Sequence, residues 1–163
     1  MDIASYISGF VDGEGCFCVS FQPSRRHRHG WEVRPSFSVS QNVDRAELLF
    51  MIQERWGCGF IRPDQKAIKF EVRTIRDLVE KVLPHFREYP LLSSKQEDVE
   101  RFGRICRLVY TGRHLEPDGF QEIVRIAMEM NPSGKRKYTG SEILTSLQPG
   151  EGIVYATGNR GST

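Results

Sequence analysis

Two carboxylates, Asp12 and Glu14, stand two residues apart in a glycine-rich stretch near the N-terminus. The preceding residues predict a helix over 2–12, so both acids fall at its C-terminal end, where the helix dipole disfavours negative charge. Acidic groups held in an unfavourable field often serve a task. If two such clusters met, divalent cations between them would relieve the repulsion, and this arrangement suits phosphodiester hydrolysis. Asp12 has a second interpretation, in which it braces the helix end.

Helical periodicity gives this first helix two opposed faces. One is an apolar stripe expected to face the core, formed by Ile3, Tyr6, Ile7, Phe10 and Val11. Small residues occupy the other side: Ser5, Gly9 and Gly13. Glycine costs a helix about 1 kcal/mol relative to alanine, so a face of this kind indicates close approach of a second helix. The alternative is that Gly13 only ends the helix and that Gly9 is incidental.

The run Ile7-Ser8-Gly9-Phe10-Val11-Asp12-Gly13-Glu14-Gly15 resembles the motif of the LAGLIDADG homing endonucleases. The likeness covers about residues 3–147 and is strongest to the single-motif, homodimeric, intron-encoded branch. It implies an α+β chain in the αββαββα order, with an antiparallel saddle-shaped sheet that binds DNA and with extra C-terminal helices. The implied activity is metal-dependent cleavage of both strands of a long, near-palindromic DNA target, leaving 3′ overhangs.

The same resemblance implies roles for particular residues. Glu14 and the backbone carbonyl of Gly13 would bind the metal. The catalytic surroundings would comprise Glu14, Gln41, Arg45 and Lys95. The dimer interface would comprise Ser5, Gly9, Asp12 and Gly13. Mg²⁺ is the expected cofactor, Mn²⁺ an expected substitute, and Ca²⁺ is expected to bind without supporting cleavage. Without the resemblance, Arg45 could pair with Asp44 or Glu47, Gln41 could cap a strand end, and Lys95 could be a surface charge.

Strict alternation of apolar and polar residues predicts strands over 16–22 and 32–41, each with one buried and one open face. A second hairpin is predicted from strands over 59–63 and 67–73. The open face carries hydroxyls, amides and arginines suited to base edges in a major groove. The expected DNA-binding residues are Ser20, Gln22, Ser24, Arg25, Arg26, Arg28, Glu32, Arg34, Ser36, Ser38, Arg62, Lys66, Lys69, Glu71 and Arg73. The alternative is a solvated sheet face without a ligand. Cys16 and Cys18 stand at positions where polar side chains that contact DNA bases would be expected.

A basic loop over 133–139 adds Lys135 and Lys137 to the expected DNA-binding set. We interpret it as a clamp on backbone phosphates that flank the target, which gives affinity without sequence information. The alternative is a solvated linker.

Further helices are predicted over 44–56, 74–86, 93–108, 117–130 and 140–147. Asp44 is expected to cap the first of these, with Glu47 at the capping-box position, and Ser93 or Ser94 to cap the third. Residues 1–147 are therefore expected to form one domain. The Gly-, Ser- and Thr-rich residues 148–163 are expected to form an extended or flexible tail.

Composition narrows the function classes. With 163 residues, 39% hydrophobic and 27% charged, the chain is globular in composition, which excludes intrinsic disorder. The net charge of +2 is small, so a surface that binds nucleic acid must come from clustered lysines and arginines. Four cysteines make neither a disulfide scaffold nor a zinc site with the four histidines.

We expect double-stranded DNA and a second copy of the chain as partners, with no membrane and no small-molecule cofactor. No secretory signal or membrane span is visible, so we expect an intracellular protein, in the cytoplasm of a prokaryote or in an organelle. A functional alternative is a non-catalytic nucleic-acid binder on the same scaffold, either an intron RNA maturase or a DNA-binding regulator.

Overall fold

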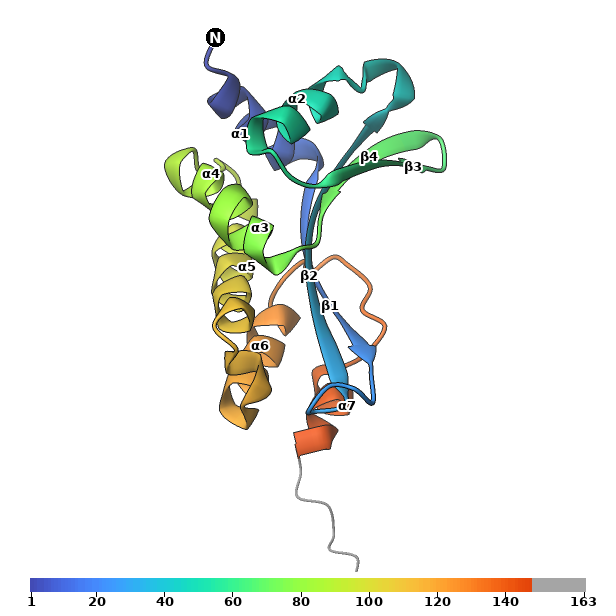
Figure 1. Ribbon diagram of the computed structural model, residues 1–163, viewed down its shortest axis with the longest axis vertical. Coiled ribbons are helices and arrows are strands. Elements are labelled where there is room, and N and C mark those ends of the chain that lie inside the picture. Colours follow the sequence, from blue (N-terminus) through green and yellow to red (C-terminus); the bar gives the residue numbers. More distant parts are fainter. Residues whose placement is uncertain (148–163) are drawn as a thin grey trace, which may run out of the picture.

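A four-stranded antiparallel sheet runs through the computed structural model, which describes residues 1–147 (Figure 1). The predicted tail, 148–163, lies outside the described residues. The strands follow one another across the sheet in the order β1-β2-β4-β3. Their bounds are Gly15–Pro23 for β1, Trp31–Asn42 for β2, Phe60–Asp64 for β3 and Ala67–Val72 for β4. All four strands were expected, the first two from residue alternation, and their predicted positions are confirmed to within a residue at each end.

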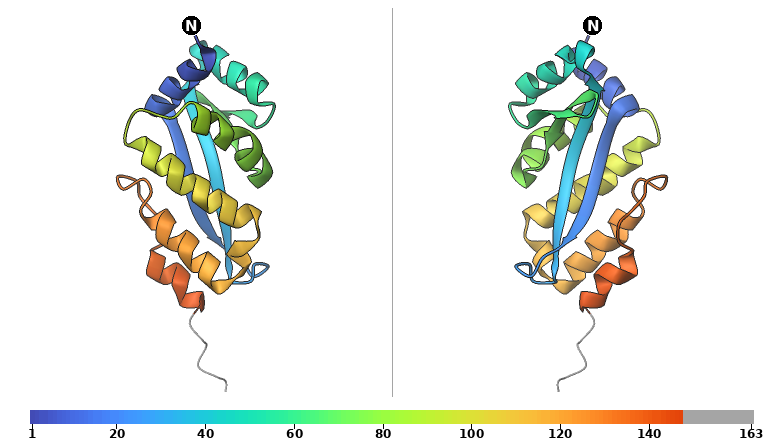
Figure 2. Two further views of the ribbon diagram at one scale, coloured as in Figure 1. Left: turned by 90° about the vertical axis from the view of Figure 1, so that its left-hand side faces the viewer. Right: turned by 90° about the vertical axis from the view of Figure 1, so that its right-hand side faces the viewer.

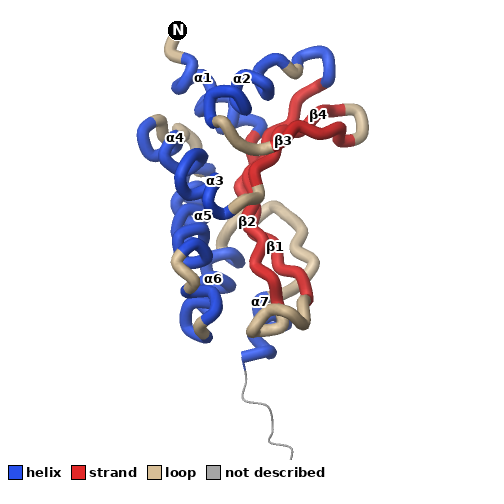
Figure 3. Tube along the Cα trace, viewed as in Figure 1, coloured by secondary structure: helices blue, strands red, loops and turns tan. Residues whose placement is uncertain are grey.

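Helices alternate with the strand pairs in the predicted order of helix, two strands, helix, two strands, helix (Figure 3). The α-helices are α1 (Ile3–Glu14), α2 (Glu47–Trp56), α3 (Ile75–Asp77), α4 (Leu83–Glu88), α5 (Lys95–Tyr110), α6 (Pro117–Met128) and α7 (Gly140–Leu144). In the described part of the chain, no helix is long and apolar enough to cross a membrane.

The structure shows how two of the predicted helices begin. Asp44 does not cap a helix over 44–56, because a 3-10 turn at Val43–Arg45 precedes α2 and places the buried Ala46 before the α-helix begins at Glu47. At α5, the Oγ of Ser93 accepts a hydrogen bond from the Lys95 amide at 3.1 Å, whereas Ser94 provides no side-chain cap.

The helix expected over 74–86 is divided and longer. A π-helical segment, Leu78–Val82, lies between α3 and α4, and the Leu83 amide bonds the Leu78 carbonyl five residues back. Pro84 follows at once and lacks the N–H that an ordinary turn would need, so the helix widens locally before it continues to Glu88.

The buried face of α1 is rotated from the predicted stripe. Ala4, Ile7, Ser8 and Val11 are buried, whereas Ile3 and Tyr6 are 46% and 51% exposed. Ser8 is inside because its Oγ donates to the Tyr89 carbonyl at 2.6 Å and lies 3.2 Å from His85 Nε2. Because these polar contacts pull Ser8 inward, the apolar residues on the far flank are left in the open. The prediction that Ile3 and Tyr6 face the core is wrong.

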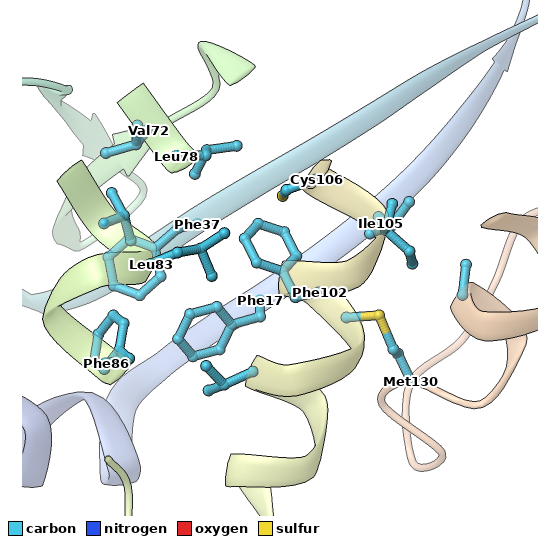
Figure 4. Close-up of a cluster of buried hydrophobic side chains, with 14 of the residues drawn as sticks. Phe17, Phe37, Val72, Leu78, Leu83, Phe86, Phe102, Ile105, Cys106 and Met130 are labelled. Carbon is cyan, nitrogen blue, oxygen red and sulfur yellow. The ribbon is translucent and has the colours of Figure 1, made fainter. Parts of the chain in front are cut away.

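The core lies between the sheet and α4 and α5, which cover one face of it (Figure 1). Phe17 and Phe37, from adjacent strands, contact each other with ring centroids 5.1 Å apart. Phe86 of α4 and Phe102 of α5 pack edge-on against Phe17 (Figure 4). Seen from the opposite side, the long strands β1 and β2 lie uncovered in front of the helices (Figure 2, right). The sheet therefore has one face in the core and one face open.

Candidate functional site

The C-terminal end of α1 carries the two predicted carboxylates, and the structure gives them different surroundings. The Asp12 carboxylate accepts hydrogen bonds from the amides of Leu92 and Ser93 at 3.1 and 3.0 Å, and another from the Ser93 hydroxyl. Burial raises the pKa of Asp12, but these hydrogen bonds outweigh it and leave that pKa below its usual value. Asp12 therefore braces the end of α1 against the turn that begins α5.

Glu14, by contrast, is exposed, and within residues 1–147 its side chain makes no ion pair or hydrogen bond. It is the last residue of α1, immediately before β1. Gly13 beside it is equally open, since a Cβ built there would meet nothing within 4 Å. Glu14 is thus the carboxylate of this motif that is available to a ligand.

Lys95 meets the same helix end from the first residue of α5. Its Nζ donates to the backbone carbonyls of Asp12 at 2.6 Å, Gly15 at 2.9 Å and Val11 at 3.2 Å. A cation at a helix C-terminus bonds the carbonyls of the last turn and offsets the negative end of the dipole. The alternative of Lys95 as an unattached surface charge is therefore wrong.

Gln41 and Arg45 approach from the end of β2. Gly15 pairs with Val39, so Gln41 lies two residues beyond that pair, at the end of the ladder where α1 joins β1. Its Oε1 accepts from the Asn42 amide at 2.9 Å. Arg45 is exposed in the 3-10 turn that follows, and no described carboxylate lies within ion-pair distance of it, so the predicted alternative of a pair with Asp44 or Glu47 is not formed.

The described residues contain no group of three or more His, Cys, Asp or Glu side chains arranged to hold a metal ion. What this chain brings to one place is the open Glu14 carboxylate with Gly13 beside it and the Lys95 ammonium held against the carbonyls of the same helix end. A carboxylate and a backbone carbonyl are hard oxygen donors, which suit Mg²⁺-like cations.

The uncovered sheet face carries the side chains that alternation predicted. Along β1, buried Phe17, Val19 and Phe21 alternate with Cys16, Cys18, Ser20 and Gln22 on the open side. The same holds along β2, where Ser36 and Ser38 flank the buried Phe37. The Arg34 guanidinium donates to the Gln22 side-chain carbonyl across the strand pair and lies 3.9 Å from a Glu32 oxygen. All four cysteines are free thiols, and burial raises the pKa of both Cys16 and Cys18.

The arginines of the loop between β1 and β2 differ in whether they are free to contact a ligand. Arg25 and Arg26 are exposed, and so is Lys66 in the other hairpin. Arg28, however, donates to the Leu115 carbonyl at 3.2 Å, and the Ser24 hydroxyl lies 2.8 Å from His27 Nδ1. In this structure Arg28 and Ser24 therefore stabilise the loop itself.

In and next to the β3–β4 hairpin, three of the expected DNA-binding residues form ion pairs with neighbouring carboxylates. Lys69 pairs with Asp64 at 3.0 Å. Arg62 and Arg73 both pair with Glu71, at 3.2 and 2.9 Å. Sequence reasoning listed Glu71 as an outward-facing reader, but its side chain is only 8% exposed.

The basic loop before α7 lies along the free edge of β1. Asn131 Nδ2 donates to the Phe17 carbonyl at 2.8 Å, and Arg136 Nη1 donates to the Val19 carbonyl at 3.1 Å. Sequence reasoning missed both residues as anchors, since their partners are more than a hundred positions away. A groove of about 1020 Å³ between this loop, β1 and the start of α5 has Lys95, Lys135 and Lys137 among its lining residues.

Comparison with known proteins agrees with this arrangement. Residues 7–106 match the family model described as LAGLIDADG endonuclease. A curated relative from Neurospora crassa, "Probable intron-encoded endonuclease 2", is 32% identical over 130 residues, which are 78% of this chain and 29% of the relative. The chain thus spans less than a third of that relative's length.

Two solved structures share the fold over nearly their whole length. The homing endonuclease I-TnaI is 31% identical with a TM-score of 0.76, and the match covers 88% of this chain and 95% of that one. The archaeal intron-encoded homing endonuclease I-Vdi141I, solved in complex with DNA, is 28% identical with a TM-score of 0.81 over 88% of this chain and 93% of that one. With a family model that spans most of the chain and two such structures of the same fold, this chain belongs to the LAGLIDADG endonuclease family.

Proposed function

We propose that this chain is a site-specific, metal-dependent DNA endonuclease that acts as a homodimer on a long, near-palindromic target and leaves 3′ overhangs. The observation that carries the proposal is that the exposed Glu14 carboxylate and the Lys95 ammonium lie at the same end of α1, where an uncovered, arginine-bearing sheet begins. Full-length similarity to I-Vdi141I, solved with DNA, supports DNA as the partner.

The proposed dimer interface is the open side of α1. Gly9 and Gly13 leave room there, since an added Cβ at either position would meet nothing within 4 Å among residues 1–147. Exposed Ile3 and Tyr6 flank this strip and supply apolar surface for a second copy. Packing two such helices about a twofold axis would bring two Glu14 carboxylates close together, and the twofold axis calls for a near-palindromic target.

In the proposed mechanism, Glu14 of each subunit and the Gly13 carbonyl hold Mg²⁺, with Mn²⁺ able to substitute and Ca²⁺ binding without cleavage. When bound, the cation supplies an activated water and offsets charge on the leaving oxygen. Lys95 places a fixed positive charge near the scissile phosphate, where negative charge develops. Gln41, at the end of β2, and Arg45, in the turn that follows, orient water and phosphate through their amide and guanidinium groups.

Cleavage of a defined target tests the proposal. The target would come from the intron-less allele of the host gene, inserted in a supercoiled plasmid and incubated with Mg²⁺, with Ca²⁺ or with a chelator. We expect the wild-type protein to linearise the plasmid only with Mg²⁺. The Glu14→Gln variant should keep binding but lose cleavage by several orders of magnitude, because the amide cannot hold the cation.

Glu54→Gln, at an exposed carboxylate of α2, is the matched control and should cleave like the wild type. Near-wild-type cleavage by Glu14→Gln would refute the mechanism. Specific binding by the wild type without cleavage under any metal condition would favour the non-catalytic binder. Location in the cytoplasm of a prokaryote or in an organelle stays a prediction.

A further inference from the structure

Glu71 is a charged side chain buried on the otherwise open face of the sheet. The residue is 6% exposed and lies near the end of β4, the strand between β3 and β2, where it pairs with Phe60 on one side and Ser38 on the other. A carboxylate removed from water is costly unless it is paired and hydrogen-bonded. Its partners therefore indicate what it does.

Two arginines of the same hairpin supply that pairing. Arg73 makes a two-point contact, with Nε 2.9 Å from one Glu71 oxygen and Nη2 3.1 Å from the other. Arg62, across the strand pair, donates from Nε at 3.2 Å. Burial raises the pKa of Glu71, but the hydrogen bonds and charges of Arg73 and Arg62 outweigh it, so the pKa lies below its usual value and the group stays ionised.

The contacts leave the outer parts of both guanidinium groups available. Glu71 occupies the Nε/Nη2 edge of Arg73, so the edge that includes Nη1 remains for another acceptor, and the Arg73 side chain is 52% exposed. The Arg62 side chain is 39% exposed, and its Nη1 donates to the Pro63 carbonyl at 3.5 Å, so Nη2 is the nitrogen left for another acceptor among the described residues. Arg73 also lies 5.6 Å from the centre of the Phe60 ring, which restricts it on a further side.

A fixed guanidinium edge has a specific chemical use. Two parallel N–H groups match O6 and N7 of guanine in the major groove, and a rigid arginine loses less rotamer freedom on binding than a free one. Phosphate attraction would need only the charge, with no buried carboxylate behind it. Direct reading by Glu71 is disfavoured, because both of its oxygens already accept from arginine and little of it reaches solvent.

We propose that Glu71 is a positioning residue that holds Arg62 and Arg73 as a rigid pair of base readers for guanines in each half-site. The proposal rests on the proposed function, since it refines how the sheet would recognise DNA. It replaces the sequence expectation that Glu71 itself contacts a base.

The test is selection of duplexes from a randomised DNA library by the full chain, with Ca²⁺ and without cleavage, which yields a base preference at each position. We expect Glu71→Gln to lower the preference for guanine at the positions read by Arg62 and Arg73 by roughly tenfold or more, and to leave other positions unchanged. Affinity for nonspecific DNA should hold or rise, because both arginine charges remain and a negative charge is gone.

Glu80→Gln is the matched control, since it removes one carboxylate of an exposed ion pair with an arginine, Arg76, in the helical segment that follows β4. Its profile should equal the wild-type profile. Arg73→Lys keeps the charge but loses the two-point contact, so it should reproduce the loss at its own position even if Glu71→Gln fails to fold.

Three results would overturn the inference while wild-type selectivity stands: an unchanged profile for Glu71→Gln or for Arg73→Lys, a switch of preferred base at a single position, or an equal loss at every position. An unchanged profile would mean that these residues play no part in base selection. A switch at a single position would mean that Glu71 contacts a base directly, and an equal loss at every position would mean that it only stabilises the fold. A wild-type protein that selects no sequence would instead refute the proposed function, and this inference with it.

Discussion

The Nζ of Lys95 lies 2.6 Å from the backbone carbonyl oxygen of Asp12, which joins the first residue of α5 to the last turn of α1. The Asp12 side chain reaches back to the amides of Leu92 and Ser93, just before α5. The end of α1 thus provides a hydrogen-bond acceptor for amides that precede α5, and α5 provides a donor for carbonyls at the end of α1. The geometry of Glu14 depends on this reciprocal contact, because Glu14 follows two residues later.

Replacing Lys95 with methionine should therefore affect stability as well as cleavage. The carbonyls of Val11, Asp12 and Gly15 would lose a charged donor, and we expect the free energy of unfolding to fall by about 1–2 kcal/mol. Urea denaturation measures this change. Lys135→Met, at an exposed loop lysine, should leave the unfolding free energy unchanged. Equal stability of Lys95→Met and wild type would mean that the three hydrogen bonds contribute nothing.

Gly9→Leu should separate folding from dimerisation. A Cβ at this position meets nothing within 4 Å among the described residues, so the monomer should fold at least as well as wild type, helped by the higher helix propensity of leucine. A second α1 could not approach, and dimer formation, tight binding and cleavage should all be lost. Sedimentation equilibrium gives the mass directly, with Glu100→Leu on the exposed side of α5 as control. A Gly9→Leu protein that remains a dimer would place the interface elsewhere.

Arg34 and Lys137 should differ in what their loss does to DNA binding. Arg34 lies on β2 beside Gln22, so Arg34→Ala should cost about 1–3 kcal/mol at one base pair of each half-site. Lys137→Ala should weaken all sequences alike and lower the slope of log K against log salt by about 1. Affinities for a target series at several salt concentrations distinguish the two. A loss that is uniform across sequences for Arg34→Ala would remove it from the readers.

Stability should fall as pH decreases below about 6.5, in part through His85. Burial and the charge of Arg55 lower the pKa of His85, which packs against Trp56 and lies 3.2 Å from Ser8 Oγ. The unfolded chain then takes up the proton first, so stability is complete above the unfolded pKa and is lost as pH falls toward the folded one. Unfolding measured from pH 7.5 to 5 should show a shallower slope for His85→Gln. Burial also lowers the pKa of His114, so part of the slope should remain.

Much of the fold could be read from local pattern. Alternation with period two located β1 and β2, because a strand with one buried face must repeat every second residue. The rotation of α1 could not be found in this way. It depends on Ser8 meeting His85 and Tyr89, partners about eighty residues away that no local period reveals.

In the candidate site, too, local features could be predicted from the sequence and long-range contacts could not. The sequence placed Glu14 at a helix end, and the structure places it there in the open. The three carbonyl contacts of Lys95 could not be predicted, since they depend on how α5 packs against α1. Glu71 lies on the predicted face of the sheet, but its burial could not be predicted, because it depends on the β3–β4 register and on the contacts with Arg62 and Arg73.

The anchoring of the loop before α7 has a consequence for how the chain behaves in a crowded solution. β1 is an edge strand, and an uncovered edge offers its carbonyls and amides to a strand of another chain. Asn131 and Arg136 occupy the outward carbonyls of Phe17 and Val19, so the stretch of backbone best placed to recruit a foreign strand is already paired. The same two side chains therefore protect the β1 edge of the sheet from pairing with a strand of another molecule.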